Sequence, residues 1–241
     1  MTDDPTKELV SEFAKELASQ LPVKEALTPP ARQTGQILED IVKTIQLALV
    51  PFQLAGALQD RLRAFIDRSV RRIPEPQRVS PAPQILGPVI EAIRYEPSGT
   101  ELDEMFSELL SSSMDLSRLN DAHPAFPSII RALSSDEAKL LKSLANGPIG
   151  QVSSSKLDRV RNLFEPMVIE ALQVPADLEY PGNARIYLEH LRQLGLVEIS
   201  VTAAPQPLME EGIQVAVRNF GAHQLSLWGI QFMRAVTKPN V

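Results

Sequence analysis

The sequence contains no cysteine and few of the other residues on which catalysis and metal binding depend. Without cysteine the chain can form no disulfide bond, no thiolate nucleophile and no thiolate ligand for a metal ion. The three histidines, His123, His190 and His223, are far apart in the sequence, so none pairs with another at a metal-ligand spacing. The sequence has neither a G-x-S-x-G nucleophile elbow nor a glycine-rich phosphate-binding loop. We therefore expect a protein that is not an enzyme, with no catalytic residue, metal, cofactor or small-molecule substrate.

The chain also lacks an excess of positive charge. Its 241 residues include 24 Lys and Arg against 30 Asp and Glu, which gives a formal net charge of −6. Such a chain has no overall attraction to nucleic acid or anionic lipid, so binding to either would need a local basic patch. The first residues are acidic and do not resemble a secretory signal. Together with the absence of cysteine, this indicates a cytoplasmic protein, with membrane association of an active form as the alternative.

No uninterrupted apolar run reaches about 20 residues, the length of a membrane-spanning helix. The nearest candidate covers residues 37–58, but it carries Glu39, Asp40 and Lys43 and is broken by Pro51. This composition favours a buried helix. Contact with an anionic membrane after a conformational change is the alternative.

Apolar residues recur at helical spacing through the first half of the chain. A long pattern covers residues 32–73, where Pro51 removes a backbone donor and predicts a kink. Five prolines between Pro74 and Pro88 predict an extended connector over residues 74–88. Core helices follow within residues 85–132, one of them starting at a capping-box arrangement of Thr100 and Asp103. We therefore predict a helical domain over residues 1–132.

The last third of the sequence mixes helical and strand patterns. Ser134 with Glu137, and Ser155 with Asp158, predict two helix starts, the second helix running to about residue 172. A helix over residues 184–194 is followed by alternating strands at 197–201 and 213–217, with a loop over 203–212 between them, and Ser226 begins a closing helix. This order predicts a small winged-helix-like α+β domain over residues 133–241. The fold class of the whole chain is then mainly α.

The helix over residues 184–194 carries the first group of candidate binding residues. In a winged-helix fold this helix would enter the major groove and present Arg185, His190, Arg192 and Gln193. Arginine can read guanine and glutamine can read adenine. Glu189 on the same helix repels phosphate, however, and the surrounding charge is nearly balanced, which favours recognition of a protein partner instead.

Four arginines near the end of the long helical pattern form the second candidate group: Arg61, Arg68, Arg71 and Arg72. Cations near the end of a helix interact favourably with its dipole. A solvated basic face is therefore favoured over a patch that binds anions or lipid, although both remain open.

Several segments, in their order and spacing, carry a resemblance to a known family. They are Pro83 with Ile85-Leu86-Gly87-Pro88, Leu102 through Met114, His123-Pro124 with Phe126, and Leu133-Ser134 with Asp136 and Leu140-Leu141. From about residue 30 onward the chain resembles the abortive infection alpha (Abi-alpha) family of bacterial proteins. The resemblance implies a helical protein that defends bacteria against phage through death or arrest of the infected cell. It brings no catalytic residues.

Our leading hypothesis is a non-enzymatic phage-defence protein that acts through a protein partner or through self-association. The first alternative is a winged-helix regulator that binds nucleic acid. The second is a membrane-active effector, in which the helix over residues 37–58 leaves the core and the arginines after it meet anionic lipid.

Overall fold

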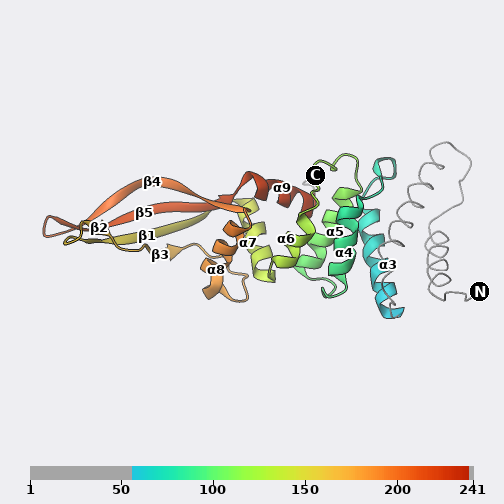
Figure 1. Ribbon diagram of the computed structural model, residues 1–241, viewed down its shortest axis with the longest axis horizontal. Coiled ribbons are helices and arrows are strands. Elements are labelled where there is room, and N and C mark those ends of the chain that lie inside the picture. Colours follow the sequence, from blue (N-terminus) through green and yellow to red (C-terminus); the bar gives the residue numbers. More distant parts are fainter. Residues whose placement is uncertain (1–55, 239–241) are drawn as a thin grey trace, which may run out of the picture. The chain divides into compact units, whose positions relative to one another are not determined.

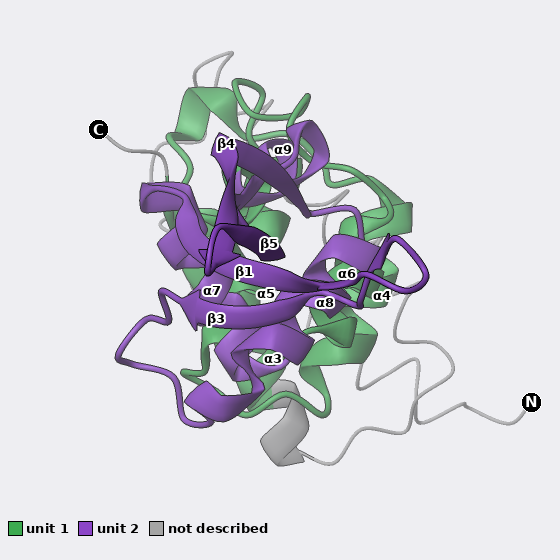
Figure 2. Ribbon diagram, turned by 90° about the vertical axis from the view of Figure 1, so that its left-hand side faces the viewer, with its two compact units in different colours: residues 1–133, 234–241 green, residues 134–233 purple. Residues whose placement is uncertain are grey.

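The computed structural model of the chain describes residues 56–238 (Figure 1). Two compact units divide the chain (Figure 2). The described part of unit 1 comprises residues 56–133 and 234–238, and unit 2 comprises residues 134–233. The predicted kink at Pro51 lies outside the described residues, as does nearly all of the candidate membrane segment over residues 37–58.

Unit 1 is helical. Its elements are α3 (Gly56–Arg71), the short 3₁₀ helix η1 (Glu75–Gln77), α4 (Pro83–Ile93), α5 (Glu101–Ser113), α6 (Phe126–Ala132) and the last residues of α9 (Leu227–Val236). The proline-rich segment over residues 74–88 is partly helical, because Pro83 occupies the first position of α4, where its missing N–H has no helical partner to lose.

Helix α5 provides the centre of the unit 1 core. It packs against α3, α4 and α6, and its side chains Met105, Phe106, Leu109 and Leu110 are at most 1% exposed. The helix begins as predicted, since the Thr100 hydroxyl accepts a hydrogen bond from the backbone N–H of Asp103 at 3.0 Å. Because α5 touches three neighbours, polar groups along it are well placed to hold the unit together.

Unit 2 combines helices with an antiparallel sheet. The helices are α7 (Ser135–Asn146), η2 (Pro181–Asn183), α8 (Ala184–Gln193) and the first part of α9, and the strands are β1 (Ile149–Asp158), β2 (Leu163–Phe164), β3 (Val168–Leu172), β4 (Val197–Glu210) and β5 (Ile213–Leu225). The sheet has the strand order β2-β1-β5-β4, and β3 also pairs with β1. The tight turn between β4 and β5 places Glu211 and Gly212 at positive φ (50° and 78°), as a two-residue hairpin requires.

The predicted fold class is wrong, because the described residues form an α+β fold and not a mainly α one. Unit 2 contains a five-stranded antiparallel sheet in place of a two-stranded wing, so it is not a winged helix. The predicted helix from Ser155 to about residue 172 is instead the end of β1 together with β2 and β3. The predicted loop over residues 203–212 is mostly strand, with Pro205 and Pro207 in β4 at the end of the sheet order.

Candidate functional site

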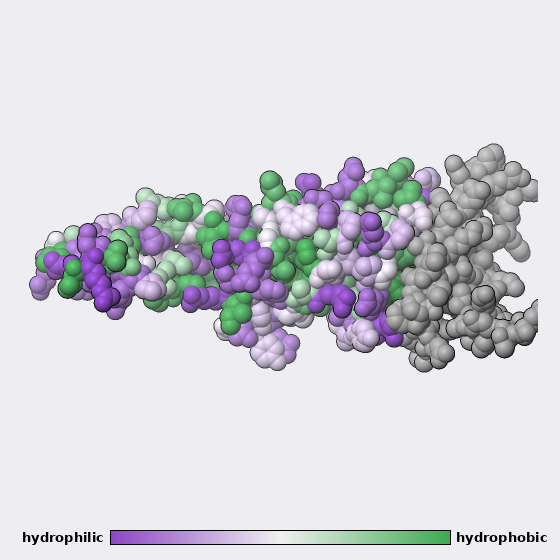
Figure 3. All heavy atoms as spheres, viewed as in Figure 1, coloured by the Kyte–Doolittle hydropathy of each residue, from purple (hydrophilic) through white to green (hydrophobic). Residues whose placement is uncertain are grey.

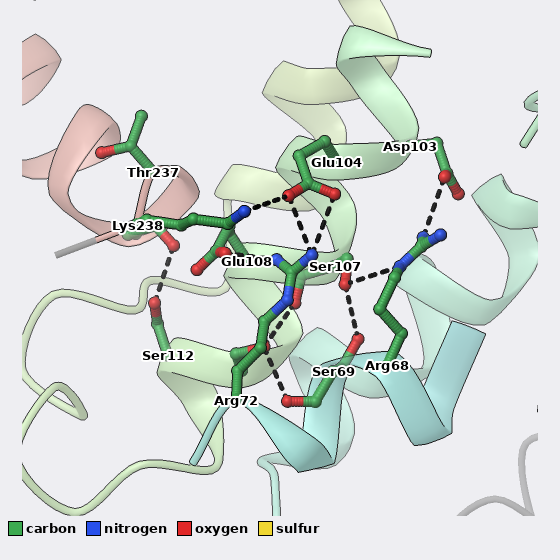
Figure 4. A network of polar contacts seen from close by, with 12 residues as sticks. Arg68, Ser69, Arg72, Asp103, Glu104, Ser107, Glu108, Ser112, Thr237 and Lys238 are labelled. Carbon is green, nitrogen blue, oxygen red and sulfur yellow. Dashed lines mark hydrogen bonds and ion pairs between the residues drawn. The ribbon is translucent and has the colours of Figure 1, made fainter. Parts of the chain in front are cut away.

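Two of the four predicted arginines, Arg68 and Arg72, meet the acidic residues of α5 (Figure 4). The guanidinium of Arg68 donates to Asp103 Oδ2 at 2.8 Å. Arg72 donates to both carboxylate oxygens of Glu104, at 2.8 and 3.0 Å, and also to Glu108. These two arginines therefore link α3 to α5, and their charges are balanced within unit 1.

Arg72 is shared by two glutamates of α5. Arg68 lies in the last turn of α3 and Arg72 directly follows that helix, whereas Glu104 and Glu108 are four residues apart on one face of α5 and both bind Arg72. Sequence reasoning missed the acidic partners. The spacing of four between Glu104 and Glu108 was the available signal, but it shows only that the two carboxylates share a face of one helix.

Glu108 is the buried centre of this network. Its side chain is 2% exposed and is shared by Arg72 and by Arg118, whose Nη1 lies 3.4 Å from Glu108 Oε2. Arg118 also donates to the backbone carbonyls of Arg234 and Thr237, each at 2.8 Å. The C-terminal residues of unit 1 are thereby tied to α5.

Glu104 is a more exposed member of the same network. Burial by itself raises the pKa of Glu104, but hydrogen bonding to Arg72 and the positive charges of Arg72, Lys238 and Arg68 bring that pKa below its usual value. Glu104 therefore stays ionised, and it binds Lys238 at 3.6 Å.

Serine hydroxyls lie next to the ion pairs between α3 and α5. The Oγ atoms of Ser69 and Ser107 are 2.9 Å apart, and Ser111 donates to the carbonyls of Ser69 and Ser107 at 2.9 and 2.7 Å. Ser112 donates to the carbonyl of Ala235 at 2.7 Å. Each of these hydroxyls forms a hydrogen bond with another buried polar group of unit 1. The small serine side chains also let the helices approach closely.

The other two arginines of the cluster lie apart from this network. Arg71 is 82% exposed and forms an ion pair with Asp67 one turn earlier, at 3.6 Å. The Nε and Nη2 atoms of Arg61 are buried and have no hydrogen-bond partner among the described residues. The structure thus does not gather the four arginines into one exposed patch, and binding of anions or lipid by them stays a prediction.

Two consecutive acids at the start of α7 hold α8 and the segment before it. Asp136 accepts hydrogen bonds from the backbone N–H groups of Glu179 and Tyr180, each at 2.8 Å. Glu137 Oε1 lies 2.6 Å from Nδ1 of His190 on α8. The other oxygen of Glu137 accepts from the N–H and the hydroxyl of Ser134, at 2.7 and 2.8 Å, which completes the predicted capping box.

This acidic pair positions α8 and has the wrong connectivity for a catalytic triad. An imidazole held by a carboxylate is the arrangement of a general base. The Ser134 hydroxyl, however, bonds Glu137 and not His190, so the cluster does not activate a nucleophile. Burial raises the pKa of Asp136, but the N–H donors of Glu179 and Tyr180, together with Lys139, bring that pKa below its usual value.

The exposed face of α8 carries the remaining predicted contact residues. Arg192 forms two hydrogen bonds with Glu189, at 2.7 and 3.1 Å, and the hydrogen bond from Arg192 lowers the pKa of Glu189. Arg185 and Gln193 are exposed. Because the Arg192 charge is already paired, the helix offers little basic surface for phosphate. The nucleic-acid hypothesis also loses the winged-helix fold on which it depended.

The last histidine of the sequence, His223, lies within the sheet on β5. His223 is 6% exposed, and its Nε2 atom is 2.8 Å from Oε1 of Gln151 on the neighbouring strand. Its Nδ1 atom has no hydrogen-bond partner among the described residues. Burial lowers the pKa of His223, so the ring is held in its neutral form.

Neither a cluster of metal ligands nor a membrane-spanning helix occurs in the described part of the chain. Within residues 56–238, no group of three or more His, Asp or Glu side chains is arranged to hold a metal ion. None of the helices described there combines the length and the apolar character needed to cross a membrane.

Comparison with known proteins identifies the family. A family model described as abortive infection alpha matches residues 56–236, which is most of the chain and nearly all of the described residues. No curated protein and no solved structure gives a significant match. The match includes the arginine and glutamate network of unit 1 and the α7–α8 cluster of unit 2, and it agrees with the resemblance found in the sequence. The chain therefore belongs to the abortive infection alpha family.

Proposed function

We propose that the protein defends bacteria against phage by abortive infection, and that it acts through protein contacts and not by catalysis. The observation that carries the proposal is the family match over residues 56–236. Because this match spans both compact units, it supports a function that uses the whole described part of the chain.

The bonding of His190, His223 and the buried acids supports the non-enzymatic part of the proposal. Glu108 is bound by two arginines, Glu137 is bound by Ser134 and His190, and His223 is buried beside Gln151. A general acid or base must reach a substrate atom. These groups instead hold helices and strands of their own unit together.

Exposed apolar side chains on unit 2 support a role in protein contacts. They include Val201, Ile186 and Leu163, which are 81%, 67% and 63% exposed. Figure 3 shows hydrophobic residues at the surface among polar ones. Val201 lies two residues from Ile199, which is 48% exposed on the same side of β4, and neighbouring apolar groups at a surface are a common feature of protein interaction sites.

The test is the survival of infected bacteria that carry this gene. We expect protection of the culture at a low phage dose, where few cells are infected, and early collapse at a high dose, where each infected cell dies or stops growing. The measurement is culture density over time, with a strain that lacks the gene as reference. Absence of protection across a broad phage panel would contradict the proposed defence role.

A histidine substitution serves as the control for catalysis. In His190→Gln the amide can still bind Glu137, so α8 should stay in place while the imidazole is lost. We expect this variant to protect as well as the unmodified protein. A folded His190→Gln protein that no longer protects would show that the imidazole has a chemical role and would overturn the non-enzymatic part of the proposal.

A further inference from the structure

Strand β4 has a free edge. It is the last strand in the order β2-β1-β5-β4, and no other strand in the described part of the chain pairs with its outer side (Figure 1). Such an edge presents backbone N–H and C=O groups that can pair with a further strand.

The free edge is protected along only part of its length. Beyond Val201 the pairing of β4 with β5 is irregular, and Pro205 and Pro207 remove backbone donors. Bulges and prolines are the usual devices that prevent strands from adding to an edge. Residues 197–201 have neither, and they keep a regular register from Val197 opposite Leu225 to Val201 opposite Gly221. The open stretch of five residues is about the usual length of a strand.

The open stretch has one apolar face. Val197, Ile199 and Val201 alternate along it, so they point to the same side of the sheet. Val197 is buried, whereas Ile199 is 48% exposed and Val201 is 81% exposed. An added strand would place its own side chains beside both of these β-branched side chains.

A second copy of this chain fits the edge by charge and by sequence. No charged residue occurs from Ile199 through Met209, although the chain carries a net charge of −6 that makes two copies repel each other elsewhere. A two-fold antiparallel pairing centred on Ile199 places Ile199 opposite its own equivalent and Val197 opposite Val201. It also places Glu198 opposite Ser200, so no like charges face each other.

We propose that two copies of the protein associate through residues 197–201 of β4, which pair antiparallel about Ile199 and join the two sheets. This proposal names the protein partner of the proposed function as a second copy of the chain. Its biological meaning rests on that proposed function. The pairing itself is a property of the purified protein, so it is tested without phage.

The first test is the mass of the full-length protein in solution as its concentration is raised. We expect a monomer–dimer equilibrium for the unmodified chain and a dimer weakened at least tenfold in Val201→Lys, because lysine at an edge opposes strand addition. Val160→Lys is the matched control, since Val160 is 97% exposed in the turn after β1 and away from the β4 edge. A protein that stays monomeric, or a dimer equally stable in all three proteins, would overturn the proposal.

The second test determines the register and uses the absence of cysteine in the chain. In Ile199→Cys the two thiols would face each other with Cα atoms about 5 Å apart, within reach of a disulfide. In Val201→Cys the equivalent thiols would be about 14 Å apart along the paired strands and out of reach. Under mild oxidation we expect a covalent dimer of the first variant and not of the second. Equal cross-linking of both variants would exclude this register.

Infection assays with the same variants keep the two proposals separate. A dimer formed by a protein that gives no protection would leave the pairing standing and contradict the defence role. Protection by the monomeric Val201→Lys protein would show that defence does not need the pairing. Loss of protection in Val201→Lys with protection kept in Val160→Lys would connect the two.

Discussion

Glu108 illustrates what a single buried charge does in this fold. The carboxylate is 2% exposed and lies between Arg72 and Arg118, so its negative charge is balanced without contact with water. Breaking such a pair from one side leaves the remaining charges buried without full compensation, which costs about 3 kcal/mol or more. Arg72 therefore depends on Glu108 more than on the partly exposed Glu104.

Two matched substitutions on α5 test this difference in burial. We expect Glu108→Gln to lower the free energy of unfolding by about 3 kcal/mol. Glu104→Gln, which removes a charge from the same arginine at a site that is 35% exposed, should cost about 1 kcal/mol or less. The measurement is urea unfolding of both variants beside the unmodified protein. Similar losses for the two variants would mean that burial of Glu108 is not what makes it important.

At the scale of elements, local signals predicted most of the helices and the first residues of β4 and β5, but they missed β1, β2 and β3. The caps at Thr100 and Ser134 were recognised because a capping box is made by residues three positions apart. The similar pair Ser155 and Asp158 led to a wrong helix prediction, because both lie in β1, which pairs with residues of β5 that are 60 to 74 positions further along the chain. Long-range pairing of this kind leaves no mark within a short window of sequence, and for the same reason the acidic partners of Arg68 and Arg72 were not foreseen.

The start of α9 shows a contact between elements that admits only glycine. A Cβ atom at Gly229 would lie 2.0 Å from the backbone oxygen of Leu196, just before β4. The same oxygen accepts a hydrogen bond from the N–H of Ser226 at 3.0 Å, and the Ser226 hydroxyl caps the helix by accepting from the N–H of Gly229 at 2.9 Å. The added Cβ atom would meet backbone atoms of Leu196, so no flexible side chain could move aside to relieve the contact.

We expect Gly229→Ala to lower the free energy of unfolding by about 3 kcal/mol, because the helix must move away from Leu196 and lose its cap. Gly182→Ala is the control, since a Cβ atom there would meet nothing within 4 Å. That variant should lie within about 0.5 kcal/mol of the unmodified protein. Thermal or urea unfolding provides the comparison, and a stable Gly229→Ala protein would show that α9 can shift without penalty.

At the scale of the whole molecule, unit 2 is inserted into unit 1 along the chain. The chain passes from unit 1 to unit 2 after Leu133 and returns at Arg234. The returning residues are held inside unit 1 by Ser112, which bonds the carbonyl of Ala235, and by Arg118, which bonds those of Arg234 and Thr237. Unit 1 is therefore completed by residues from the end of the described chain, and its stability should depend on that attachment.

Amide hydrogen exchange of Arg118→Gln tests this dependence within each unit. The substitution removes the two carbonyl contacts and one partner of Glu108, so we expect faster exchange in α3 and α5, equivalent to about 2–3 kcal/mol of lost stability. Arg131→Gln is the control in the same unit, because its pair with Glu91 is 3.8 Å long and about half exposed.

If the units open independently, amides in β1 and β5 should keep their protection. Equal loss in both units would show that they unfold together, and unchanged exchange in α3 and α5 would show that unit 1 is stable without its returning segment.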